Sequence, residues 1–90
     1  MRYTRNNDFV MREIAGEVFL IPVGNASVRF NGMITLNSVS AYIWKKLENP
    51  ISKEELISAM LEDYEVEKEQ VEKDVTEFLN MLKQLEMVNC

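Results

Sequence analysis

Histidine is missing from the 90-residue sequence, and cysteine occurs only once, at position 90. Without histidine the chain lacks the side chain that most often acts as an acid or base near neutral pH and most often binds metals. A single cysteine allows no internal disulfide and leaves a structural zinc site without its usual ligands. The serines also have no histidine base, which excludes a serine-hydrolase triad. The sequence therefore predicts a protein that is not an enzyme and has neither a metal site nor a cofactor.

Long apolar runs are missing as well. No stretch approaches the length of a membrane span, and no signal-peptide pattern stands at the N-terminus, so the cytoplasm is the expected location. Hydrophobic residues nevertheless make up 47% of the chain, which is typical of a folded globular protein. Residues 1–8 are polar and unpatterned, and we expect a flexible, loosely held N-terminal arm there, followed by a single domain over residues 9–90.

The charge is unevenly distributed along the chain. Residues 1–51 hold six basic and four acidic side chains, whereas residues 52–90 hold four basic and eleven acidic ones, so the two parts carry +2 and −7. An acidic surface repels phosphate backbones. The sequence therefore favours a basic or neutral partner and predicts that nucleic acid is not one.

The first part of the chain is typical of an antiparallel sheet. Residues 9–14 and 17–23 are rich in β-branched and aromatic side chains, and Ala15-Gly16 between them is short enough for a tight hairpin. A third strand is predicted at Met33–Leu36, after the turn signal Asn31-Gly32. Its odd and even positions would face opposite sides of the sheet, which indicates a sheet that is covered on one side only. The sequence leaves open whether Val28–Phe30 forms a short strand beside it or an ordered loop.

Three helices are predicted in the rest of the chain. Asn37 is a good N-cap for a helix over about residues 38–48. Ser52 and Glu55 have the spacing of a capping box at the start of a second helix. A third helix, over about residues 68–86, carries apolar side chains at intervals of three and four. A small antiparallel three-stranded sheet followed by three helices predicts an α+β fold of winged-helix type.

A winged-helix DNA-binding transcriptional regulator is the alternative function. A recognition helix usually offers Arg, Lys, Asn or Gln to bases and phosphates. The second predicted helix offers Lys53 alone against four acidic residues, and the third offers three lysines against five acidic residues. The electrostatics of both helices count against DNA binding.

Several short motifs follow one another in a distinctive order. They are R-E-I-A-G-E at 12–17, L-N at 36–37, I-W-K-K-L at 43–47, E-E-L-I at 54–57 and D-V-T-E-F-L at 74–79. Their order and spacing resemble the PqqD family over about residues 9–88. The resemblance implies a winged-helix domain that acts as a recognition element for ribosomally synthesised, post-translationally modified peptides. Such a peptide chaperone binds the leader segment of a precursor peptide and presents it to a modifying enzyme, often a radical S-adenosylmethionine (radical SAM) enzyme.

The resemblance also implies where the peptide binds. In the family the leader adds as an antiparallel strand to the third strand and rests against the third helix. The expected peptide-binding residues of this chain are Met33, Ile34, Thr35 and Leu36 on the strand, Asp74, Phe78 and Met81 on the helix, and Lys73 and Glu77 as charges at the rim. Strand addition needs an open sheet edge rather than reactive side chains. An open edge also permits a homodimer, and a strand at Val28–Phe30 would block it.

Overall fold

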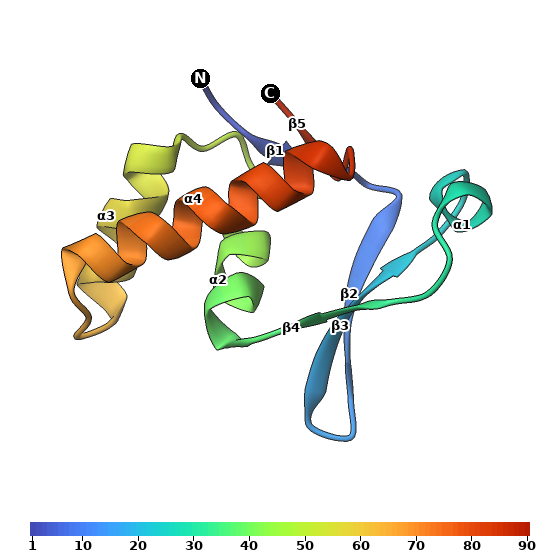
Figure 1. The fold of residues 1–90 in the computed structure, drawn as a ribbon, viewed down its shortest axis with the longest axis horizontal. Coiled ribbons are helices and arrows are strands. Elements are labelled where there is room, and N and C mark those ends of the chain that lie inside the picture. The colour runs from blue at the N-terminus through green and yellow to red at the C-terminus, as the bar shows by residue number, and fades with distance from the viewer.

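The computed structural model describes residues 1–90 and confirms the predicted α+β architecture (Figure 1). The elements in chain order are β1 (Thr4–Arg5), β2 (Phe9–Ile14), β3 (Glu17–Pro22), α1 (Ala26–Arg29), β4 (Ile34–Leu36), α2 (Ser38–Lys46), α3 (Lys53–Asp63), α4 (Lys68–Gln84) and β5 (Val88–Asn89). None of the helices combines the length and the apolar character that a bilayer-spanning segment requires. Compared with the prediction, the structure adds one short helix, α1, and a small second sheet made by β1 and β5.

The main sheet is antiparallel and contains β2, β3 and β4, with β3 in the middle. Ala15 and Gly16 connect β2 to β3 with φ angles of 52° and 83°, the positive values that a two-residue type I′ turn needs. One face of the sheet enters the hydrophobic core, where Phe9, Leu20 and Leu36 are buried. The sheet is therefore covered on one side, as the alternation in the third strand predicted.

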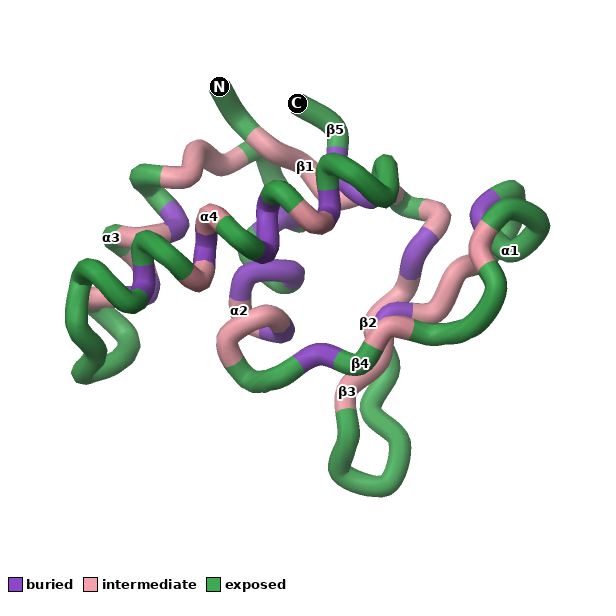
Figure 2. Tube along the Cα trace, viewed as in Figure 1, coloured by how far each residue is buried: buried purple, intermediate pink, exposed green.

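The core joins that face of the sheet to helices α2, α3 and α4. Trp44 of α2 is its largest fully buried side chain. Along α4, buried stretches alternate with exposed ones (Figure 2). The buried residues of α4 are Val71, Val75, Phe78, Leu79 and Leu82. Val71, Val75, Phe78 and Leu82 repeat the spacing of three and four residues that the sequence predicted, whereas Leu85, at the next position of that spacing, is exposed. The stripe packs α4 against α2 and α3.

The first eight residues differ from the loosely held arm expected from the sequence. Tyr3 and Ile51 exchange two backbone hydrogen bonds of 2.8 and 3.1 Å. The amide of Arg5 donates to the carbonyl of Leu47 at 2.9 Å, and β1 pairs with β5, which brings the two termini side by side (Figure 1). Main-chain groups make these bonds, so the side-chain pattern of this segment gave no sign of them. The expectation of a flexible arm is corrected accordingly.

The connection between β3 and β4 is the second difference. Residues Ala26–Arg29 form the single turn of α1, so Asn31-Gly32 does not join two paired strands. Gly32 has a φ of 107°, but Asn31 lacks the positive φ that the hairpin turn predicted there requires. Val28 is 87% exposed, whereas Phe30 packs edge-on against Phe9 with 5.7 Å between ring centroids. A strand would have placed these two side chains on the same face. The connection therefore does not supply the strand beside β4 that the sequence left open.

The predicted capping box is present at the start of α3. The amide of Glu55 donates to Ser52 Oγ at 3.1 Å, and the amide of Ser52 donates to Glu55 Oε1 at 3.0 Å. Two hydrogen bonds lower the pKa of the Glu55 carboxyl: the one from the Ser52 amide has the larger effect, and the one from the Ser52 hydroxyl has the smaller effect. Two otherwise unpaired amides at the helix end are thus satisfied.

Ser52→Ala is expected to lower the free energy of unfolding by about 1 kcal/mol, because one amide of the first turn of α3 loses its acceptor. Urea denaturation followed by circular dichroism measures this loss. Ser58→Ala is the matched control, since Ser58 lies exposed in the same helix and takes no part in the cap. Equal losses in the two variants would show that the capping box contributes nothing specific.

Candidate functional site

The outer edge of β4 is open. β4 pairs with β3 through Val18 opposite Leu36, Phe19 opposite Thr35 and Leu20 opposite Ile34, and no strand lies on its other side. The segment that the sequence could have placed there is the helical turn α1 instead. The sheet therefore presents a short edge strand whose outer main-chain groups can accept another strand.

The register of the sheet shows which main-chain groups of β4 face outward. The amide of Val23 donates to the carbonyl of Asp8 at 2.7 Å, on the side of β3 that faces β2. Because the bonding direction alternates along a strand, the odd-numbered residues of β3 bond to β2 and the even-numbered ones bond to β4. Ile34 and Leu36 lie opposite even-numbered residues and are therefore tied to β3. The amide and the carbonyl of Thr35 point away from the sheet.

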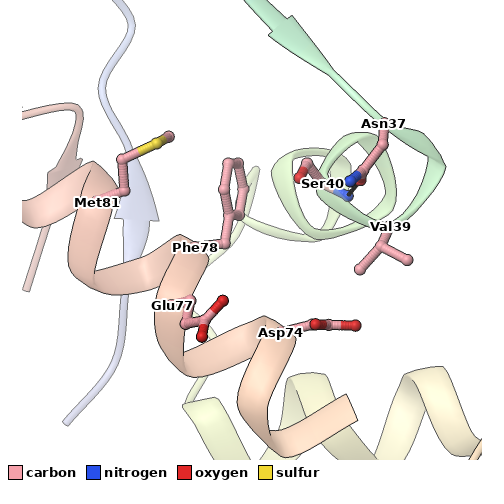
Figure 3. Close-up of a pocket in the computed structure, with 7 residues that line it drawn as sticks. All are labelled: Asn37, Val39, Ser40, Asp74, Glu77, Phe78 and Met81. Carbon is pink, nitrogen blue, oxygen red and sulfur yellow. Dashed lines mark hydrogen bonds between the residues drawn. The ribbon is translucent and has the colours of Figure 1, made fainter. Parts of the chain in front are cut away.

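A pocket of about 250 Å³ lies between the first turn of α2 and the middle of α4 (Figure 3). Its apolar lining comes from Phe78, which is buried, and from Val39 and Met81, which are partly buried. Figure 3 shows the Phe78 ring rising from α4 next to the first turn of α2. Asp74 and Glu77 place carboxylates along the α4 side of the pocket. The pocket therefore offers an apolar surface with an acidic rim.

Asn37 joins the open edge to this pocket. It directly follows β4, and its side chain accepts a hydrogen bond of 2.8 Å from the amide of Ser40, which starts α2. Both residues line the pocket. A chain that pairs with β4 and continues past Leu36 is thus led directly to the pocket.

Neither carboxylate of the acidic rim takes part in an ion pair. Asp74 accepts a hydrogen bond of 2.9 Å from the side-chain amide of Gln70. Glu77 has neither a hydrogen bond from a side chain nor an ion pair. No cluster of carboxylates and cysteine is arranged to hold a metal ion. The site is suited to attract a basic group.

The structure brings together most of the residues that the sequence predicted for the site. Ile34, Thr35 and Leu36 form β4, and four of the predicted α4 residues line the pocket: Asp74, Glu77, Phe78 and Met81. Met33 lies one residue before β4 and is 54% exposed. Lys73 is also exposed but does not line the pocket.

Three pocket residues were missed by sequence reasoning: Asn37, Val39 and Ser40. They belong to the cap and the first turn of α2, where the sequence indicated Asn37 as the helix cap and Ser40 as part of the buried side of the helix. The signal was nevertheless present. A helix that begins one residue after an edge strand must place its first turn at the end of that strand, and so beside any segment paired with it.

Two solved structures share this fold. One is described as TbiB1 in complex with the TbiA(beta) leader peptide; it has a TM-score of 0.72 and 27% sequence identity, and the match covers 96% of this chain and 94% of that one. The other is described as lasso peptide synthetase B1 complexed with the leader peptide; it has the same TM-score of 0.72 and 18% identity, and 98% of each chain is covered. At that identity the second similarity shows the fold alone. Among curated protein sequences, none matches the chain.

A family match covers nearly all of the chain and includes β3, β4, all four helices and all of β2 except Phe9. The family is described as coenzyme PQQ synthesis protein D, and the match runs over residues 10–88. The motifs in the sequence, the fold and this match agree with one another, and the chain belongs to the PqqD family.

Proposed function

We propose that this protein binds the leader segment of a ribosomally synthesised precursor peptide and presents it to a modifying enzyme. The observation that carries the proposal is the open edge of β4, which ends beside a pocket with an apolar surface and an acidic rim. Membership of the PqqD family and the similarity to TbiB1, described in complex with a leader peptide, support it. The protein acts by binding rather than by catalysis.

The leader would add to β4 as a fourth strand of the sheet. Main-chain hydrogen bonds with Thr35 supply affinity, and a side chain that enters the pocket supplies selectivity. Phe78 and Met81 offer that side chain an apolar surface, and the flexible thioether of methionine adapts to its shape. Asp74 and Glu77 favour a basic residue next to the apolar one.

The partner enzyme is, in this proposal, a radical SAM enzyme, as the resemblance to the family implies. DNA binding is not retained as an alternative. The first turn of α3 carries Glu54 and Glu55, and no basic residue lies in its last turn. TbiB1, the neighbour with 27% identity, is described in complex with a leader peptide.

Titration of the isotopically labelled protein with the precursor peptide encoded beside its gene tests the proposal. The changes in backbone amide chemical shift should cluster on residues 34–36 and 74–81, because these residues form the edge and the pocket wall. Nuclear magnetic resonance spectra recorded along the titration measure the pattern. Shift changes spread over the surface, or none at all, would contradict leader binding at this site.

A pair of adjacent variants provides the control. Met81→Ser removes an apolar side chain from the pocket, whereas Asn80→Ser changes an exposed residue of the same helix that does not line it. We expect Met81→Ser to weaken peptide binding by roughly 1 kcal/mol, in line with the loss of buried apolar surface. Asn80→Ser should leave the affinity unchanged.

A further inference from the structure

The sheet has a second open edge, on β2. This strand has six residues, twice as many as β4, and pairs only with β3. The bonding direction alternates along β2 as it does along β3. Val10 and Arg12 therefore bond to β3, while Met11 and Glu13 direct their amides outward. No backbone group bonds to either of these two amides. Of the carbonyls of these two residues, only that of Met11 has a partner, because Arg12 Nη1 donates a hydrogen bond of 2.9 Å to it.

A pocket of about 280 Å³ accompanies this edge too. It is lined by Arg5, Asn7, Phe9, Val10, Met11, Arg12 and Trp44. Arg5 Nη1 donates to the Trp44 carbonyl at 3.3 Å, and its guanidinium carbon lies 6.0 Å from the centre of the indole ring. The indole and this hydrogen bond hold the Arg5 side chain in place at the pocket.

Two cations of this pocket have no acidic partner. The ion pairs of the structure involve Arg2, Arg29 and Lys68, so neither Arg5 nor Arg12 has a carboxylate within 4.0 Å. The protein as a whole carries a net charge of −5, so this cationic pocket is a local exception. Guanidinium groups bind carboxylates through two parallel hydrogen bonds, which gives such a pair geometric specificity.

We propose that the outer edge of β2 is a second docking site, which takes an extended, acidic segment of a partner protein. The segment pairs with the outward main-chain groups of Met11 and Glu13, and its carboxylates reach Arg5 and Arg12. On binding, the Arg12 guanidinium exchanges its hydrogen bond to the Met11 carbonyl for one to a carboxylate of the segment. Strand addition supplies the affinity, and the two arginines select the charge. This site is distinct from the leader site at β4 and does not depend on it.

A second copy of the chain fits this edge less well than an acidic segment. In a two-fold symmetric pair each surface meets itself, so the Arg5 and Arg12 of one copy would approach those of the other. Like charges placed opposite one another across paired strands are destabilising. Charge complementarity therefore favours an acidic partner over self-association.

Both edges can be occupied at the same time. β2 and β4 are separated by β3 alone, and neighbouring strands lie ~4.8 Å apart, so the two outer strands are about 10 Å from each other. A peptide on β4 and a partner segment on β2 would extend one continuous sheet in opposite directions. The partner would thus be held close to the leader without contacting its binding edge.

The test uses the labelled full-length chain and a short N-acetylated peptide that alternates valine with glutamate. We expect shift changes at the amides of Met11 and Glu13. Arg12→Gln should weaken binding about fivefold, the effect of losing one exposed ion pair of ~1 kcal/mol. Lys83→Gln removes the same charge from exposed α4 and should leave the affinity unchanged. Thr35→Pro, which removes the outward amide of the β4 edge, should also leave the affinity for this peptide unchanged.

Four results would overturn the proposal. The first is that a peptide with lysine in place of glutamate binds as tightly, and the second is that Arg12→Gln and Lys83→Gln weaken binding equally. The third is that the shift changes centre on β4 instead of β2. The fourth is that the shifts at Met11 depend on protein concentration in the absence of any peptide. The last would assign the edge to a second copy of the chain. Because the Thr35→Pro protein retains the β2 edge, a failure of leader binding and a failure of this inference give different results.

Discussion

Thr35→Pro should leave the domain folded and weaken its binding of the leader peptide by about 1 kcal/mol or more, at least fivefold. The amide of Thr35 points away from the sheet, so proline removes a hydrogen bond that only the incoming peptide would make. The preceding residue, Ile34, already has the extended conformation that proline demands. Isothermal titration calorimetry measures the affinity, and urea denaturation measures the stability.

Two neighbouring substitutions separate the main-chain effect from other effects. Thr35→Val keeps the amide and changes only an exposed side chain, so it should bind the peptide normally. Ile34→Pro removes an amide that is bonded to β3 and should destabilise the sheet itself. A folded Thr35→Pro protein that binds the leader as tightly as the unmodified one would show that the peptide does not pair with β4.

Deletion of residues 1–5 should lower the free energy of unfolding by about 3 kcal/mol, because several backbone hydrogen bonds of about 1 kcal/mol each are lost. The deletion removes both bonds between Tyr3 and Ile51 and the bond from Arg5 to Leu47, and it leaves β5 without its partner. Urea denaturation monitored by the fluorescence of Trp44, the single tryptophan, measures the change.

Removal of Cys90 alone is the control for this deletion. Cys90 is exposed and lies outside β5, so its loss should have little effect on stability. If the deletion of residues 1–5 were as harmless as the loss of Cys90, the N-terminal segment would be the loosely held arm that its sequence suggests.

Side-chain patterns predicted the parts of the fold that side chains determine. The tight hairpin at Ala15-Gly16, the capping box at Ser52 and the apolar stripe of α4 all depend on residue type at a fixed spacing, and all three are present. Two features were not predicted correctly. The pairing of β1 with β5 depends on main-chain groups of polar residues, and α1 is too short to show a helical period.

The candidate site was predictable to a similar extent. The strand edge and the α4 residues follow from local pattern and family resemblance, and the structure places Phe78 and Met81 at one pocket. Whether the edge was free depended on where Val28–Phe30 folds, and that is decided by tertiary contacts such as the packing of Phe30 on Phe9. The outward direction of the Thr35 amide likewise depends on the register of the whole sheet, which no single strand reveals.

The pairing of β1 with β5 has a consequence for how this domain can be built into larger proteins. Thr4 lies opposite Asn89, so the chain enters and leaves the domain at neighbouring points. Paired strands are ~4.8 Å apart, a gap that a surface loop of a host protein can span without distortion. The domain is therefore suited to insertion into such a loop, and to circular permutation with new ends at the exposed turn of Ala15-Gly16. Either arrangement would leave both outer edges of the main sheet accessible.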